Sequence, residues 1–292
     1  MAGRERTLQS MTQPLPPQTL APRCLHRASR PPVVIGATGG SGTRVIHRIL
    51  EKAGLFMGAP AKLNHAGDAM DIEPILDAFI NPILTSTKSL DYQVEELPHD
   101  LSVAARDELA LSINRFLDDL PNGDGPWGWK NPRSMYVLPL IADLFPTVRF
   151  IHLVRDGRDM ATSGNQNQPR KHFEALFGEA LDETDPSGSI QLWAAANLAI
   201  ARWGERHLES SYLRIRFEDL CANPIEKVGA ILNFAGLEAA TDEIIQDIAT
   251  EFVTPPKSLG RWLKLDAPVA NLLTRRGIDA LHHFDYPELG SE

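Results

Sequence analysis

Apolar and polar residues follow two different periods along the chain, and this pattern predicts strands interleaved with helices. Three short apolar runs are typical of buried strands: 33–36, 148–154 and 211–217. Five longer segments repeat apolar residues at helical spacing: 43–54, 100–120, 134–144, 189–208 and 224–235. Strands that alternate with helices predict an α/β fold, here a single three-layer domain with a central parallel sheet and a P-loop-like turn after its first strand.

The segments outside this pattern predict the domain organisation. Residues 1–30 are rich in Pro, Gln, Arg and Ser without any periodicity, which indicates a flexible N-terminal tail. A transit peptide is the alternative, since the tail is rich in Arg and poor in acids, but it shows no amphipathic pattern. Residues 31–292 are expected to form one domain, in which 164–188 forms a flap with a short helix near 171–180. No apolar stretch approaches the length of a membrane span, so we expect a cytoplasmic protein.

A glycine-rich turn follows the first predicted strand and holds the first candidate chemistry. The turn comprises Thr38, Gly39, Gly40, Ser41, Gly42, Thr43 and Arg44. Glycines let the backbone approach a ligand, and the free N–H groups at the start of the next helix attract anions. A Walker A loop needs a lysine directly before its Ser or Thr, whereas Gly42 precedes Thr43. The turn alone leaves an NAD(P) site and a phosphosulfate site as equal alternatives.

A second motif follows the strand 148–154. Arg155 stands at the end of this strand, where its guanidinium offers a planar fork to phosphate. If a helix begins near Gly157, Ser163 lies about two turns along it and can bind the same anion. Arg155 and Ser163 resemble the motif that grips the 3′-phosphate of 3′-phosphoadenosine 5′-phosphosulfate (PAPS) in sulfotransferases. Arg158 and Asp159 are expected to form an ion-pair cluster that caps the helix.

Three further segments resemble sulfotransferases in the order of that family. Lys130, Asn131 and Pro132 are similar to an element of the membrane-type and tyrosylprotein branch, where the lysine reaches the transferring sulfuryl group. Phe217 takes the tyrosine position of the family's Tyr-Glu-Asp-Leu strand end, so that only a ring face remains for the base. Gly260 and Arg261 resemble the loop that closes over the nucleotide.

The resemblance implies a PAPS-dependent sulfotransferase that moves a sulfuryl group to a hydroxyl or amine by in-line displacement and releases PAP. The implied nucleotide-binding residues are Gly39, Gly40, Ser41, Gly42, Thr43, Arg44, Arg155, Ser163, Phe217, Gly260 and Arg261. No metal is required if cations and backbone N–H groups neutralise the developing charge. The acceptor is a small molecule, lipid, glycan or peptide.

The catalytic residues are less directly indicated. The family usually places Lys or Arg directly before Ser-Gly-Thr, but this chain has Gly40, so the leaving-group cation is expected from Arg44 or Lys130. The tyrosylprotein branch places a carboxylate shortly after the first helix, so the resemblance implies Asp68 and Asp71 as candidate general bases. On a helix, residues three apart share one face, so both could reach the site. The alternative is that both acids only solvate a loop or cap a helix.

Composition excludes some classes of protein. The net charge of −9 and the lack of a dense Lys/Arg patch oppose nucleic-acid binding. Cys24 and Cys221 share no metal-binding spacing, so free thiols are expected.

Two alternatives to a sulfotransferase stay open. One is an NAD(P)-binding reductase similar to atypical short-chain dehydrogenases, although no acidic residue ends a second strand about 20 residues past the turn. The other is a PAP-binding protein that has lost catalysis.

Overall fold

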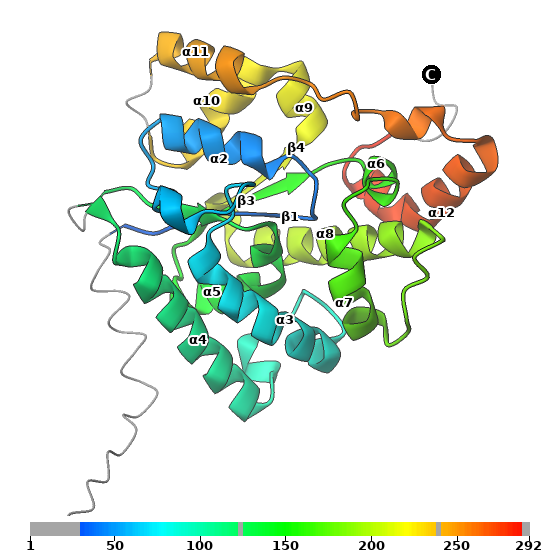
Figure 1. The fold of residues 1–292 in the computed structure, drawn as a ribbon, viewed down its shortest axis with the longest axis horizontal. Coiled ribbons are helices and arrows are strands. Elements are labelled where there is room, and N and C mark those ends of the chain that lie inside the picture. Colours follow the sequence, from blue (N-terminus) through cyan, green and yellow to red (C-terminus); the bar gives the residue numbers. More distant parts are fainter. Residues whose placement is uncertain (1–29, 122–124, 238–240, 288–292) are drawn as a thin grey trace, which may run out of the picture.

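The structure is a computed structural model that describes residues 30–121, 125–237 and 241–287 (Figure 1). It confirms the predicted α/β architecture, with a parallel sheet covered by helices on both faces. The sheet has the strand order β2-β1-β3-β4. Its strands are β1 Val33–Ala37, β2 Gly128–Lys130, β3 Arg149–Val154 and β4 Tyr212–Arg216. The predicted tail and Cys24 lie outside the described residues, apart from Arg30, whose carbonyl accepts a hydrogen bond from Trp127.

The strand register explains how one sheet supports two cores. Side chains alternate between the faces of a strand, so Val34 points to one core and its neighbours Val33 and Ile35 point to the other. Val34 lies opposite Trp129 of β2 and Phe150 of β3, which belong to the same core as Val34. The near-continuous apolar strands in the sequence therefore reflect burial on both faces.

The helices divide between these two faces (Figure 1). On the face of Val33 lie α2 Thr43–Lys52, α10 Pro224–Phe234 and α11 Asp242–Phe252. On the face of Val34 lie α3 Glu73–Thr87, α4 His99–Leu117, α5 Leu138–Leu144, α7 Asn167–Phe177 and α8 Ser187–His207. The remaining α-helices are α6 Gly157–Ala161, α9 Phe217–Ala222 and α12 Ala267–His283. Short 3₁₀ helices are η2 Pro60–Lys62, η3 Met70–Ile72, η4 Val94–Glu96, η6 Pro132–Val137, η7 Glu209–Ser211 and η8 Arg261–Lys264.

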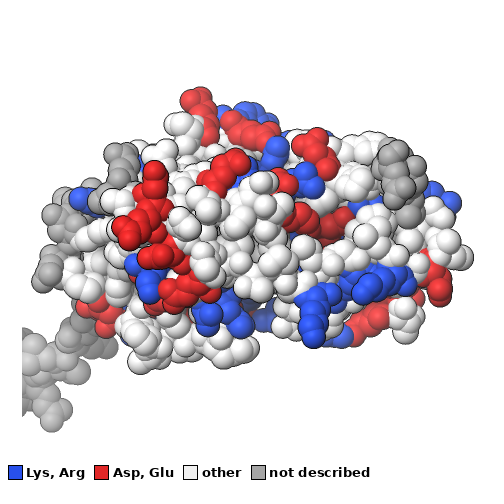
Figure 2. All heavy atoms as spheres, turned by 90° about the horizontal axis from the view of Figure 1, so that it is seen from above, with Lys and Arg blue, Asp and Glu red and all other residues white. Residues whose placement is uncertain are grey.

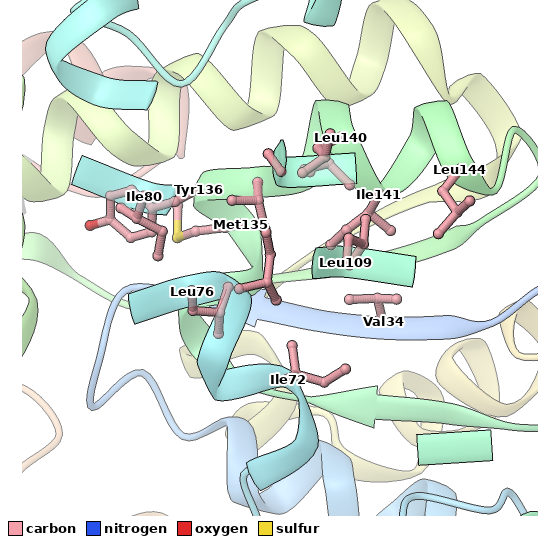
Figure 3. Packing of buried hydrophobic residues seen from close by; sticks show 14 of the residues in the cluster. Val34, Ile72, Leu76, Ile80, Leu109, Met135, Tyr136, Leu140, Ile141 and Leu144 are labelled. Atoms are coloured by element: carbon pink, nitrogen blue, oxygen red, sulfur yellow. The ribbon is translucent and has the colours of Figure 1, made fainter. Parts of the chain in front are cut away.

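The larger core lies between β1 and the helices α3, α4 and α5 (Figure 3). Val34 contributes from the sheet, Leu76 from α3, Leu109 from α4 and Ile141 from α5, and all four are almost completely buried. This packing fixes the carboxyl ends of β1 and β2, where the candidate ligand-binding residues lie.

Two predicted elements differ from the structure near the candidate site. The helix of 164–188 spans Asn167–Phe177 instead of 171–180, because Gln168 is buried in its first turn and Gly178, with a φ of 77°, ends it. The helix after Arg155 is much shorter than expected. It ends at Ala161, so Ser163 follows the helix and does not lie two turns along it.

Charged side chains of both signs share the face seen in Figure 2. Acidic and basic groups are interspersed there, and some of the basic ones form a narrow strip on one side. With a net charge of −9, an anionic ligand must therefore be bound by local contacts, because the average field of the protein is repulsive.

Buried histidines predict how stability depends on pH. Burial lowers the pKa of His47 and of His152 from 6.5 to about 4, and that of His172 to about 3. Below about pH 6.5 the unfolded chain binds protons that the native protein does not, so stability must fall as the pH falls toward 4. Each histidine contributes up to about 1.4 kcal/mol per pH unit. Urea unfolding between pH 7.5 and 5.5 measures this, and an unchanged free energy of unfolding would contradict it.

Candidate functional site

The glycine-rich turn joins β1 to α2 at the carboxyl edge of the sheet (Figure 1). Gly40 and Gly42 have φ angles of 93° and 95°, in the left-handed region that glycine adopts without strain. Ser41 is buried, and its hydroxyl donates a 2.7 Å hydrogen bond to the Thr38 carbonyl, which closes the turn. Gly42 is the N-cap of α2 and supplies no side-chain cap, so the first N–H groups of the helix remain available to an anion.

Arg155 lies at the end of β3, the strand next to β1. Its side chain is 5% exposed, and Nη2 donates to a carboxylate oxygen of Asp159 at 3.0 Å and to the Ser258 carbonyl. Its Nε is buried without a partner among the described residues. Ser163 accepts a hydrogen bond from the Asn165 N–H, and its hydroxyl oxygen would lie 3.8 Å from a Cβ placed on Gly40. The Ser163 hydroxyl thus borders the glycine-rich turn.

Asp159 connects the predicted loop of Gly260 and Arg261 to the segment that contains Arg155 and Ser163. Its buried carboxylate accepts hydrogen bonds from the backbone N–H groups of Gly260 at 2.8 Å and Trp262 at 3.0 Å. Arg261 in turn donates to the Thr162 carbonyl at 3.4 Å. The sequence predicts only a capping role for Asp159, because nothing local indicates a contact with residues about a hundred positions away.

Arg158 has the structural role that the sequence predicts. Its guanidinium is fully buried, pairs with Asp156 at 2.7 Å and stacks 3.4 Å from the ring centre of Trp262. Asp156 also caps α6 by accepting the N–H of Arg158.

Phe217 packs under the turn. A Cβ on Gly42 would lie 2.4 Å from its ring, and the Arg155 guanidinium lies 5.5 Å from its ring centre. Phe217 is 3% exposed and opens α9, one residue after β4 ends. In this structure the ring supports the turn and offers little open face to a base.

Lys130 and Asp68 form the polar centre of the site. Lys130 ends β2 and is buried, and its Nζ donates to Asp68 Oδ1 at 2.5 Å and to the Ala66 carbonyl at 2.7 Å. Asn64 donates to the other Asp68 oxygen at 3.0 Å and accepts the N–H groups of Ala66 and Asp68. Burial lowers the pKa of the Lys130 ammonium, and the charge of Asp68 opposes that shift. The carboxylate is therefore oriented on both oxygens while its side chain remains 18% exposed.

The two candidate bases do not share a helix face, so that part of the sequence-based prediction is wrong. Asp68 lies in the loop before η3, whereas Asp71 lies within η3. Asp71 points to Lys62, 3.3 Å from its Nζ, and Lys62 also pairs with Asp119. A turn forms here instead of a continuous helix, because Asn64 takes up the backbone N–H groups of the loop.

Two residues of α2 complete the surroundings. Arg44 is exposed in the first turn of α2, and its charge adds to the effect of burial in lowering the pKa of Lys130. Sequence reasoning missed His47, which lies on the buried face of α2 with its ring against Gly67. The burial of His47 could have been predicted from the apolar residues Ile46 and Ile49, because His47 lies on the same face of the helix. Because its pKa is about 4, His47 is neutral at pH 7 and packs beneath the loop that holds Asp68.

A cavity of about 210 Å³ opens beside Asp68. It is bordered by Gly39 of the turn, Asn131 after β2, and Lys171 of α7. A separate cavity of about 260 Å³ lies beyond Ser163, lined by residues of 161–170 and 181–189. Asp71 lines neither cavity, whereas Asp68 faces the first.

This geometry defines a class of protein: an α/β protein whose glycine-rich turn and buried arginine, on adjacent strands, suit a nucleotide with two separated phosphate groups. The model of the sulfotransferase family matches residues 31–242, so the chain belongs to the sulfotransferase family, whose members are PAPS-dependent enzymes. Membership in this family excludes the NAD(P)-binding reductase. No curated protein shows a significant match to the chain.

Two solved structures with TM-scores above 0.5 agree with this fold. Sulfotransferase STF9 from Mycobacterium avium is 15% identical, with 91% of this chain and 80% of that chain covered and a TM-score of 0.54. The sulfotransferase domain of the Synechococcus PCC 7002 olefin synthase is 18% identical, with 89% and 96% covered and a TM-score of 0.53. A structure of retinol dehydratase with retinol and PAP is 14% identical, with 90% and 83% covered and a TM-score of 0.47. Among the helices of the described ranges, none is long and apolar enough to cross a membrane.

Proposed function

We propose that this enzyme transfers the sulfuryl group of PAPS to a hydroxyl or amine of its acceptor, with Asp68 as the general base and Lys130 as the cation at the sulfuryl group. The observation that carries the proposal is the Lys130–Asp68 pair at 2.5 Å, at the carboxyl end of β2 beside the glycine-rich turn. A base and a cation that touch each other can act on the two reaction partners of one transfer step.

The residues at the strand ends fit the nucleotide. PAPS supplies a sulfuryl group on a phosphate oxygen that leaves readily. Residues 39–43 and the uncapped N-terminus of α2 bind its 5′-phosphosulfate, where backbone N–H groups and the helix dipole favour negative charge. Arg155 and Ser163 bind the 3′-phosphate. The buried Nε of Arg155, which has no partner among the described residues, supports this assignment.

The chain's own groups account for the movement of charge and proton. Asp68 takes the proton of the acceptor as the acceptor oxygen or nitrogen bonds to sulfur, and the sulfur–oxygen bond to the phosphate breaks with its electron pair on the released PAP. An ammonium carries three donors, and Ala66 and Asp68 occupy two donors of Lys130. The third can bind a sulfuryl oxygen as charge develops there.

The absence of a lysine or arginine at position 40 of the glycine-rich turn has a conformational reason. Gly40 has a positive φ, and a Cβ there would lie 3.1 Å from the methyl group of Met160, so a lysine would strain the turn. We assign the cation for the leaving phosphate to Arg44, which lies in the first turn of α2. Replacing Gly40 by lysine is therefore a poor test of this assignment, because the strain and the charge would change together.

The proposal also covers the branch of the family and the extent of the catalytic domain. The sequence Lys130-Asn131-Pro132 supports a relationship to the membrane-type and tyrosylprotein branch of the family. Residues 31–292 form the catalytic domain in our proposal, which extends the matched region 31–242 by α11 and α12. The extension is needed because Gly260 and Trp262 bind Asp159 beside Arg155.

Lys130→Ala is expected to lower kcat about a hundredfold, the usual cost of removing one donor to the transition state. PAP affinity should change little, because PAP lacks the sulfuryl group. Lys62→Ala is the matched control, since Lys62 is also a lysine paired with carboxylates, but its partners are Asp71 and Asp119 and not Asp68. Steady-state kinetics and PAP titration measure both effects, and equal kcat values for the two variants would contradict the role of Lys130.

The proposed function is tested by thermal unfolding with PAP, PAPS, AMP, NADPH and ATP, followed by assays of sulfuryl transfer with EDTA present. PAP and PAPS should raise the melting temperature far more than the other nucleotides, because bound ligand stabilises the native state. Turnover should persist in EDTA. Stabilisation by NADPH alone, or a strict need for Mg²⁺, would overturn the proposal. Binding of PAP without transfer to any acceptor would select a non-catalytic PAP-binding protein.

A further inference from the structure

The cavity beside Asp68 has a distinctive lining. Five of its eleven lining side chains are primary amides: Asn64, Asn131, Asn165, Asn167 and Gln168. Four others are charged, and the remaining two residues are a proline and a glycine. Among the described residues that line the cavity, this proline is the only one with an apolar side chain. Ligand sites are usually lined mostly by apolar side chains, so this composition indicates an unusual acceptor.

Some amide groups of the cavity already hydrogen-bond within the protein, and others are left to bind a ligand. Gln168 donates to the Ala37 carbonyl at 3.2 Å and accepts from Tyr136 at 3.3 Å, so it is part of the framework. The Asn131 oxygen accepts the Arg133 N–H at 3.1 Å, while its Nδ2 donates to no other described residue. The exposed side chain of Asn167 makes no hydrogen bond within the described ranges. Both donors and acceptors are therefore left for a ligand.

The charges in the cavity balance each other. Asp68 and Glu73 contribute two carboxylates, and Arg133 and Lys171 contribute two cations. Asp77, outside the cavity, pairs with both cations, at 2.5 Å with Arg133 and at 3.3 Å with Lys171. A ligand is thus selected by hydrogen bonds rather than by its net charge.

We infer that the acceptor is a saccharide or a similar polyol, which carries further hydroxyl groups next to the one that receives the sulfuryl group. This inference rests on the proposed function. A hydroxyl both donates and accepts, and so does a primary amide, which makes the two groups complementary. A phenol, steroid or fatty alcohol would cover the amides without hydrogen bonds, at a cost of about 1–3 kcal/mol for each unsatisfied group.

The size of the cavity limits how much of the acceptor it holds. Its volume of about 210 Å³ is smaller than the roughly 300–1,000 Å³ of sites that enclose a whole drug-sized ligand. The cavity therefore holds one sugar unit next to Asp68, and any further units lie outside it.

The experiment compares two sets of acceptors on the same protein. Methyl glycosides of glucose, galactose, mannose and N-acetylglucosamine, and disaccharides of these sugars, form the first set, and 4-nitrophenol, 2-naphthol and 1-decanol form the second. Labelled sulfuryl transfer from PAPS should give at least one saccharide a kcat/KM a hundredfold or more above the best member of the second set. Equal or faster transfer to a phenol or alkanol, or transfer to no saccharide by protein that binds PAP, would overturn the inference. Failure to bind PAP by calorimetry would instead overturn the proposed function.

A variant tests the amides themselves. Asn167→Leu should raise the KM of the best saccharide at least tenfold and leave the Kd of PAP unchanged. Asn233→Leu is the matched control, because Asn233 is an exposed asparagine on α10, remote from the cavity. An unchanged KM in a folded Asn167→Leu protein would overturn the role of the amides.

Discussion

Asp68→Asn is expected to lower kcat by about 10²- to 10⁴-fold, the usual contribution of a general base. The amide has nearly the same shape as the carboxylate, and its oxygen still accepts from the Lys130 ammonium. Only the acceptor for the Asn64 amide is lost, so the fold and the affinity for PAP should be retained. It cannot take the acceptor's proton at neutral pH. Single-turnover assays with saturating PAPS measure the loss directly, because they separate the chemical step from product release.

Asp71→Asn is the control for this prediction. Asp71 lies three residues away, pairs with Lys62 and lines neither cavity, so its replacement should change kcat by less than a factor of about three, since it touches neither reaction partner. If Asp71→Asn lost activity while Asp68→Asn kept it, the assignment of the base would be reversed. Comparable losses in both variants would point to a shared effect on the loop.

Arg155→Ala is expected to weaken PAP binding by about 2–4 kcal/mol, or roughly 30- to 1,000-fold, as the loss of a charged hydrogen-bonding group does. AMP lacks the 3′-phosphate, so its affinity should already be low in the unaltered protein and should fall little further. The measurement is the ratio of the PAP and AMP dissociation constants by calorimetry. A ratio that survives in Arg155→Ala would contradict the 3′-phosphate assignment.

Arg155 also has a structural role that requires a second variant. Its partner Asp159 is buried, and removing the guanidinium leaves that carboxylate with only the N–H groups of Gly260 and Trp262. Ser163→Ala avoids this problem because Ser163 lies outside the ion pair. It should lower the PAP-to-AMP preference by about tenfold, in line with one hydrogen bond to a charged group, without changing the melting temperature.

The strands and most helices were predictable because their signals are local. Residues 33–36 and 148–154 are apolar runs with turn residues after them, and they became β1 and β3. Element ends were less predictable, because they depend on contacts elsewhere. Phe217 opens α9 instead of extending β4, since its ring packs on Gly42 and Arg155.

The sequence by itself determined the glycine-rich turn after the first strand and the arginine at the end of β3, and the motif of Lys130, Asn131 and Pro132 singled out the lysine. Each of these is encoded by residues adjacent in the chain, where strand and turn propensities act locally. Only the tertiary structure shows that Lys130 pairs with Asp68 and not with Asp71, because Asp68 and Lys130 are 62 positions apart in the chain. It also brought Gly260 to Asp159 across 101 residues and gathered amides from separate loops and from the start of α7 into one cavity. Such contacts depend on how aperiodic loops pack against one another, and no periodicity or spacing in the sequence records that packing.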